Sequence, residues 1–73
     1  MATLSARQKN ILQFIISFFN ENKFPPTIRE IGETVGISST SVVNYNLAKL
    51  EEEQLLMRRR EVSRGLSLNW SRL

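Results

Sequence analysis

The sequence contains no cysteine, no histidine and no aspartate. Without cysteine, disulfides and thiolate chemistry are excluded. Without histidine the commonest general base and the commonest metal ligand are missing, and the lack of aspartate removes most other metal-site patterns. A serine nucleophile would have only lysine or glutamate to activate it. We therefore expect no enzymatic activity, no catalytic residue, no metal site and no cofactor.

Long hydrophobic runs are also absent. The most apolar stretch, Ile11 to Phe19, is interrupted by Gln13 and Ser17. It is far shorter than the roughly 20 residues that a membrane-spanning helix needs. Because no secretory signal pattern is present either, we expect a cytoplasmic protein without a membrane partner.

The charge of the chain is unevenly placed. Its 73 residues predict a single small domain with a net charge of +3. Residues 58–73 contain five arginines against Glu61 alone, whereas residues 1–57 contain five basic and six acidic groups. A basic C-terminal segment on a near-neutral body indicates a polyanionic partner or, with equal weight, a solvated charged hairpin.

A capping pattern marks the start of a first helix. Ser5 and Gln8 form an S-x-x-Q box ahead of a wide apolar stripe at helical spacing. We predict a helix over residues 6–22, buried on most sides. Pro25 and Pro26 then force extended backbone and end it.

A second box, T-x-x-E, is formed by Thr27 and Glu30. It predicts a short helix over residues 28–35, and Gly36 lies where a left-handed C-terminal residue is wanted. Apolar residues at helical spacing predict a third helix from Ser39 or Thr40 to Glu52. The second and third helices, joined by a short turn, form a helix-turn-helix.

The C-terminal part predicts a β-hairpin. Apolar and polar residues alternate there, which indicates antiparallel strands over about residues 55–59 and 64–69 with a turn near residues 61–62. The predicted fold class is mainly α with a small β-hairpin, a three-helix winged helix-turn-helix in the order helix, helix, helix, strand, strand. Residues 1–73 would form one domain, with the helix-turn-helix over about 28–50 and the wing over about 55–69.

Five phrases of the chain resemble the N-terminal DNA-binding domain of LexA-type repressors. They are LSARQ at 4–8, PPTIREIG at 25–32, VGI at 35–37, LAKLE at 47–51 and SRGL at 63–66. The phrases align without a gap over about residues 3–70. The chain departs from the family at Glu53-Gln54, where a glycine and a basic residue are usual. The self-cleaving serine-lysine peptidase domain of LexA proteins is not among these residues, so the resemblance implies no self-cleavage here.

The resemblance implies sequence-specific binding of double-stranded DNA by a transcriptional repressor, an SOS-type or phage-type regulator encoded by a bacterium or phage and linked to DNA damage. The third helix would enter the major groove and the basic wing would contact the backbone or minor groove. Such repressors usually read two half-sites of a palindromic operator. We expect a homodimer on DNA or through a C-terminal domain, and a monomer alone. The alternative is a winged helix used for protein–protein interaction, which the triple glutamate at 51–53 would support.

Two sets of residues are candidates for DNA contact. The recognition-helix set faces away from the predicted inward stripe or matches the base-reading positions of the family: Ser39, Thr40, Ser41, Val42, Asn44 and Tyr45. The set for phosphate or minor-groove contact is Thr27, Arg29, Lys49, Arg58, Arg59, Arg60 and Arg64. Asn44 can pair with adenine through one donor and one acceptor. In the alternative interpretation, Ser39 only caps the helix, and Asn44, Asn46 and the arginines are merely solvated.

Overall fold

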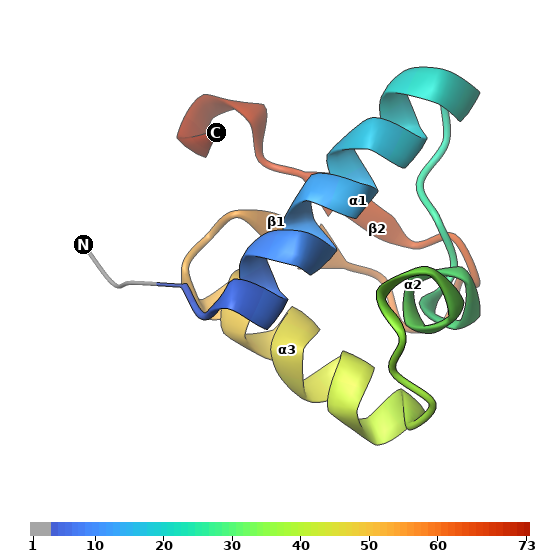
Figure 1. Ribbon diagram of the computed structural model, residues 1–73. Helices are drawn as coiled ribbons and strands as arrows, with labels where there is room; N and C mark the ends of the chain where they lie inside the picture. The colour runs from blue at the N-terminus through green and yellow to red at the C-terminus, as the bar shows by residue number, and fades with distance from the viewer. Residues whose placement is uncertain (1–3) are drawn as a thin grey trace.

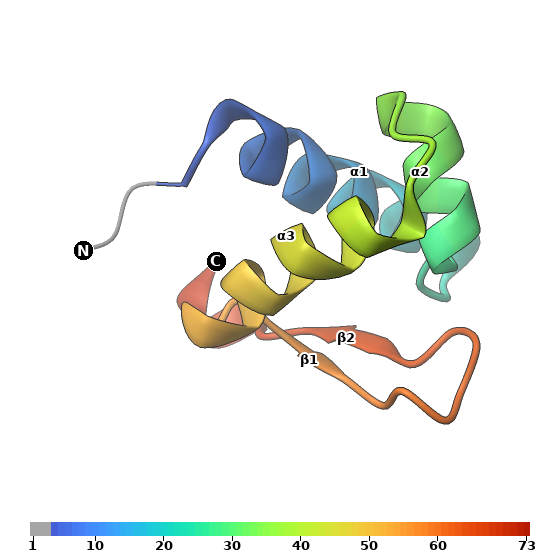
Figure 2. The same cartoon turned by 90° about the horizontal axis from the view of Figure 1, so that it is seen from below.

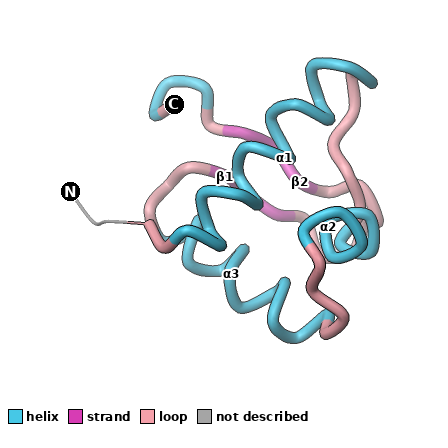
Figure 3. The backbone as a smooth tube through the Cα atoms, in the orientation of Figure 1, coloured by secondary structure: helices cyan, strands magenta, loops and turns pink. Residues whose placement is uncertain are grey.

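The computed structural model describes residues 4–73 and contains three helices, a two-stranded antiparallel hairpin and a final 3-10 turn (Figures 1 and 3). The elements are α1 (Ala6–Asn22), α2 (Ile28–Val35), α3 (Thr40–Glu52), β1 (Leu56–Arg58), β2 (Leu66–Leu68) and η1 (Trp70–Arg72). The mainly helical winged helix-turn-helix expected from the sequence is confirmed, and so are the bounds of the three helices.

Both predicted capping boxes are formed. The Ser5 hydroxyl accepts a hydrogen bond from the Gln8 amide at 3.1 Å, and the Gln8 side chain accepts one from the Ser5 amide at 3.0 Å. In the second box the Thr27 hydroxyl accepts from the Glu30 amide at 3.1 Å, and the Glu30 carboxylate accepts from the Thr27 amide at 2.8 Å. Each box satisfies two backbone donors that the first turn of a helix leaves without partners. This local exchange explains why the helix starts could be located from the sequence.

The turn between α2 and α3 sets the direction of α3. Gly36 has a φ of 78°, the left-handed conformation that favours glycine, and its amide donates to the carbonyl of Gly32. Ser39 then caps α3 by accepting a hydrogen bond from the Val42 amide at 3.4 Å. Placed in this way, α3 packs against α1, α2 and β1.

The hydrophobic core draws on every helix and on both strands. Its buried residues are Ile11, Ile15, Ile31, Val43, Leu47, Leu50, Leu56 and Leu66. Only Ile11 and Ile15 of α1 are fully buried, so the expectation that this helix is buried on most sides was wrong. So small a fold has too few elements to surround a helix. Within residues 4–73, no helix combines the length and the apolar character needed to cross a bilayer.

Two partly exposed aromatic residues of α1 pack against rings outside that helix. Phe18 packs edge-on against Phe24 with ring centroids 5.7 Å apart. The ring centroid of Phe19 lies 6.1 Å from that of Trp70, although Trp70 remains 52% exposed. Trp70 therefore contacts α1, and Leu68 of β2 packs against the core.

The strands are shorter than expected, three residues each, with Leu56 opposite Leu68 and Arg58 opposite Leu66. Two successive turns occupy the connection between them. In the first the Val62 amide donates to the Arg59 carbonyl, and in the second the Gly65 amide donates to the Val62 carbonyl, both at 3.1 Å. Residues 59 and 64–65 therefore belong to the loop, although the alternation of apolar and polar residues predicted them to lie in the strands.

The end of α3 adopts a left-handed backbone without a glycine. Gln54 has a φ of 61°, and its amide donates to the Glu51 carbonyl at 2.9 Å. The Leu55 amide reaches back to the Leu50 carbonyl at 3.1 Å. A left-handed residue favours glycine, which is the residue type that the resemblance to LexA-type repressors leads us to expect at Glu53-Gln54.

Gly65 is a position where any side chain should disrupt the wing. An added Cβ would collide with the Arg59 carbonyl oxygen and lie 2.9 Å from that of Val62. We expect Gly65→Ala to lower the free energy of unfolding by about 1–3 kcal/mol and to speed hydrogen exchange of the Arg59 amide, which donates to the Gly65 carbonyl. Ser67→Ala, at an exposed position of β2, is the control. Unchanged exchange at Arg59 in Gly65→Ala would contradict this prediction.

Candidate nucleic-acid interface

A groove of about 390 Å³ lies between the start of α2, the first turns of α3 and the wing. Figure 2 shows the hairpin lying alongside α3, and β1 packs directly on that helix. Seven of the predicted site residues line the groove: Thr27, Arg29, Thr40, Asn44, Arg58, Arg59 and Arg60. The fold therefore brings polar residues of the helix-turn-helix together with arginines from a distant part of the chain.

The inner side of α3 determines which of its residues face outward. Val43, Leu47 and Leu50 are buried and form the inward apolar stripe of this helix. The remaining candidates of this helix are then turned away from the core. Ser39, Thr40, Ser41 and Tyr45 are exposed, whereas Val42 and Asn44 are half-buried.

Asn46 is not solvated, and that alternative interpretation of it was wrong. Only 5% of the residue is exposed. Its Oδ1 accepts a hydrogen bond from Gln8 at 3.2 Å, and its Nδ2 donates to the Val42 carbonyl at 2.8 Å. Because Asn46 shares the inward side with Val43 and Leu50, it joins α3 to α1 rather than facing a ligand.

Arg58 links the wing to α3. Its Nη2 donates a hydrogen bond to Oδ1 of Asn44 at 2.7 Å, and its Nη1 is buried with no hydrogen-bond partner among residues 4–73. Burial and, to a smaller extent, the nearby charge of Arg60 lower the pKa of Arg58, while Glu51 acts in the opposite sense. The sequence analysis identified Asn44 as a candidate for DNA contact. Its hydrogen bond with Arg58 joins residues 14 positions apart, so local sequence patterns could not reveal it.

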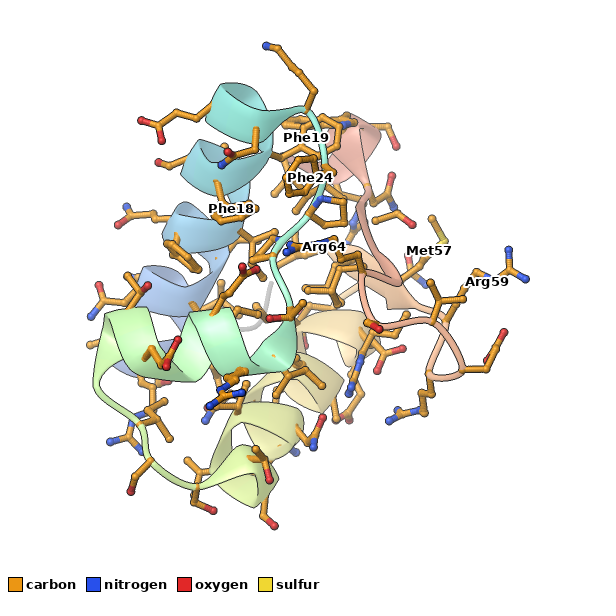
Figure 4. All side chains as sticks on the ribbon, turned by 90° about the vertical axis from the view of Figure 1, so that its right-hand side faces the viewer. Phe18, Phe19, Phe24, Met57, Arg59 and Arg64 are labelled. Atoms are coloured by element: carbon orange, nitrogen blue, oxygen red, sulfur yellow. The ribbon has the colours of Figure 1, made fainter. Side chains whose placement is uncertain are left out.

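Arg59 and Arg60 are the exposed arginines of the wing. Nε of Arg59 lies 3.5 Å from Oε1 of Glu61, and Nη2 of Arg60 lies 3.3 Å from Oε1 of Glu51. In Figure 4, Arg59 points away from the body of the molecule. Exposed ion pairs of this kind contribute little to stability, so both guanidinium groups can exchange their partners for a polyanion.

Arg64 is directed elsewhere, although the sequence placed it with the phosphate contacts. Its guanidinium donates to both carboxylate oxygens of Glu30, at 2.8 and 3.1 Å, and to the Pro25 carbonyl at 2.9 Å. It also lies over the rings of Phe18 and Phe24, 5.8 and 4.7 Å from their centroids (Figure 4). Arg64 thus ties the hairpin to the start of α2, and its charge is balanced by Glu30.

This pair shifts the pKa values of both partners. The hydrogen bond from Arg64, aided by the Thr27 amide, lowers the pKa of Glu30 from its ordinary value of 4.5 to about 2. The same hydrogen bond raises the pKa of Arg64. Because the pKa of Glu30 is depressed in the folded state, its ionised form stabilises the fold above pH 4.5, and that stabilisation is lost as the pH falls towards 2.

We expect Glu30→Gln to be less stable than the parent chain near neutral pH. The difference in free energy of unfolding should shrink below about pH 4.5 and become small as the pH falls below about 2, because the parent carboxylate is then mostly protonated. Urea denaturation across this pH range measures it. Glu33→Gln, which removes an exposed carboxylate 3.9 Å from Arg29, is the control. A difference that stayed constant with pH would contradict the assigned role of the Glu30 carboxylate.

The remaining candidates lie at two edges of this surface. Arg29 is highly exposed at the start of α2 and lines the groove. Lys49 lies beside Tyr45 on α3, with its Nζ 5.5 Å from the ring centroid and 3.5 Å from Glu52. Lys49 and Tyr45 extend the polar surface along α3 from the groove towards the C-terminal end of that helix.

Two helices joined by a left-handed glycine turn, with an exposed outer face on the second and a basic hairpin beside it, define a winged helix-turn-helix protein. Comparison with known proteins identifies the family. The chain belongs to the LexA DNA-binding domain family, whose model matches residues 1–65.

Individual relatives agree with this family. The LexA repressor of Roseiflexus sp. (strain RS-1) is 54% identical over 65 residues, which cover 89% of this chain and 30% of the relative. The LexA repressor of Carboxydothermus hydrogenoformans is 46% identical over 65 residues, covering 89% and 32%. That of Brevibacillus brevis is 41% identical over 68 residues, covering 93% and 33%. The chain thus spans about a third of the length of these relatives.

Proposed function

We propose that the chain binds double-stranded DNA in a sequence-specific manner, as the DNA-binding part of a transcriptional repressor. Residues 1–73 act as one domain, with the helix-turn-helix at about 28–50 and the wing at about 55–69. The observation that carries the proposal is the groove in which the outer face of α3 meets the arginines of the wing. Membership of the LexA DNA-binding domain family supports it.

In this proposal the N-terminal half of α3 enters the major groove. Its exposed or half-exposed side chains offer hydroxyl, amide and apolar groups to base edges: Ser39, Thr40, Ser41, Val42, Asn44 and Tyr45. None of them carries a charge, so they add little to general attraction for phosphate. They therefore contribute mainly to the choice of sequence.

General affinity comes from residues around α3 that can contact phosphate. Arg59 and Arg60 on the wing, and Thr27 and Arg29 at the start of α2, line the groove from two sides and contact phosphates or the minor groove. Lys49 adds a cation farther along α3, and Arg58 lies between the two sets of contacts. Arg64 is not one of these contacts, because Glu30 already balances its charge.

A single copy offers few base contacts and should bind weakly. We propose that two copies occupy a palindromic operator, as a homodimer formed on DNA or through a further C-terminal domain, and that the chain alone is a monomer. This DNA-binding domain is non-catalytic. Its relatives carry the name LexA repressor, and we propose an SOS-type or phage-type regulator of the response to DNA damage in a bacterial cytoplasm.

Selection of bound sequences from random duplex DNA tests this function. We expect enrichment of one palindromic sequence, bound at least about tenfold more tightly than random duplex at the same salt concentration. Ser17→Ala, at an exposed position of α1, should behave like the parent chain. Equal affinity for all duplexes would overturn specific recognition. A module used for protein–protein interaction would give that result, and no observation in the structure favours such a module.

A further inference from the structure

We propose that Arg58 is a positioning residue that fixes the side-chain amide of Asn44 with its nitrogen free to donate. The chain would then read guanine, and not adenine, at the base pair that faces Asn44. This inference rests on the DNA binding proposed above and concerns the specificity of the same surface. The observation behind it is the 2.7 Å hydrogen bond that Nη2 of Arg58 in β1 donates to Oδ1 of Asn44 in α3.

The orientation of the Asn44 amide follows from the chemistry of its partner. The oxygen and nitrogen of an asparagine side chain are usually assigned from the surrounding hydrogen bonds. A guanidinium group has only donors and no acceptor. The amide atom 2.7 Å from Nη2 of Arg58 must therefore be the oxygen, Oδ1. The other end of the amide, Nδ2, carries two hydrogens and no acceptor.

The surroundings of Arg58 favour keeping this hydrogen bond when DNA binds. Nη1 of Arg58 is already buried without a hydrogen-bond partner among residues 4–73. If Oδ1 of Asn44 turned towards a base, Nη2 would lose its acceptor as well. A half-buried charged group would then hold two unpaired nitrogens, which is unfavourable. Hydrogen bonds from a charged donor are also among the stronger ones, so the amide is held by its oxygen.

The hydrogen-bond pattern of the bases then determines the preference. Adenine offers an acceptor at N7 and a donor at N6, so pairing with it at two points requires the amide oxygen as well as the nitrogen. Guanine offers two acceptors, N7 and O6, which match the two hydrogens of Nδ2. Thymine offers one acceptor at O4, and the N4 group of cytosine offers only a donor. With its oxygen held by Arg58, Asn44 is therefore expected to prefer guanine, whereas a free asparagine side chain would be expected to prefer adenine.

The experiment compares the base preferences of three variants with those of the parent chain, on duplexes that differ at one base pair. Asn44→Ala first identifies the base pair that Asn44 faces, because preference is lost there. At that pair the parent chain should prefer guanine to adenine by about 5- to 100-fold. Arg58→Met keeps an unbranched apolar stem and removes the donors of the side chain. This variant should move the ratio towards adenine by at least about tenfold.

Arg59→Met is the matched control, since it removes the same charge from the same hairpin without contacting Asn44. It should weaken binding to every duplex equally and leave the base preference unchanged. A parent chain that prefers adenine at this pair would overturn the inference, even if Arg58→Met fails to fold. A folded Arg58→Met with unchanged preference would overturn it as well.

The failure of this inference can be distinguished from the failure of the proposed function. If no duplex binds better than random DNA, specific recognition itself is refuted, and the inference fails with it. If an operator is found and Asn44→Ala relaxes no position, DNA recognition stands and only the role of Asn44 and Arg58 is refuted.

Discussion

Replacement of Leu47 by alanine should lower the free energy of unfolding by about 2–5 kcal/mol. Leu47 is fully buried on the inward side of α3, within the cluster that joins this helix to the other helices and the hairpin. Truncation removes apolar contacts and leaves a cavity among neighbours that can relax only partly. So small a domain has a total stability of only several kcal/mol, and a large fraction of the molecules should unfold on mild heating.

Urea denaturation followed by circular dichroism measures this loss. Leu47→Met, which nearly conserves the volume, is the matched control and should lose less than about 1.5 kcal/mol. A loss below about 0.5 kcal/mol in Leu47→Ala would show that α3 is turned differently about its axis. In that case the set of residues assigned to its outer face would also be incorrect.

Combined replacement of Arg59 and Arg60 by alanine should weaken binding to all DNA duplexes by roughly 10- to 100-fold at about 0.1 M salt. Both side chains are exposed and engaged only in weak surface ion pairs. If each contacts one phosphate, the slope of the logarithm of affinity against the logarithm of salt concentration should fall by about 2. The preferred sequence should not change, because phosphate contacts carry no direct sequence information.

Lys23→Ala combined with Arg72→Ala removes the same charge from exposed residues that do not line the groove. This control should keep most of the salt dependence of the parent chain. An unchanged slope in the Arg59 and Arg60 variant would refute the proposed role of the wing. Arg58 is kept in both proteins, since its guanidinium holds Asn44 and its loss would change specificity and affinity together.

The helices could be predicted residue by residue because the interactions that start and end them are local. The two capping boxes each join residues three positions apart. The prolines after α1 and the left-handed Gly36 after α2 act within one turn of the helix that they end. The strands were placed less well, since hairpin pairing depends on the turns between the strands. Alternation of residue types did not indicate the two turns between Arg59 and Gly65.

The sequence by itself excluded cysteine and histidine chemistry for these 73 residues, and it determined the three helices and the side of α3 that faces the core. Those properties depend on residue types and on spacings of a few positions. Only the tertiary structure decided what each arginine of the hairpin does. Arg58 contacts Asn44 across 14 positions, and Arg64 contacts Glu30 across 34. Arginines look alike in a sequence, but the acceptors that chain folding brings within hydrogen-bond distance differ for each of them. Folding therefore leaves Arg59 and Arg60 exposed, whereas it engages Arg64 in an ion pair with Glu30.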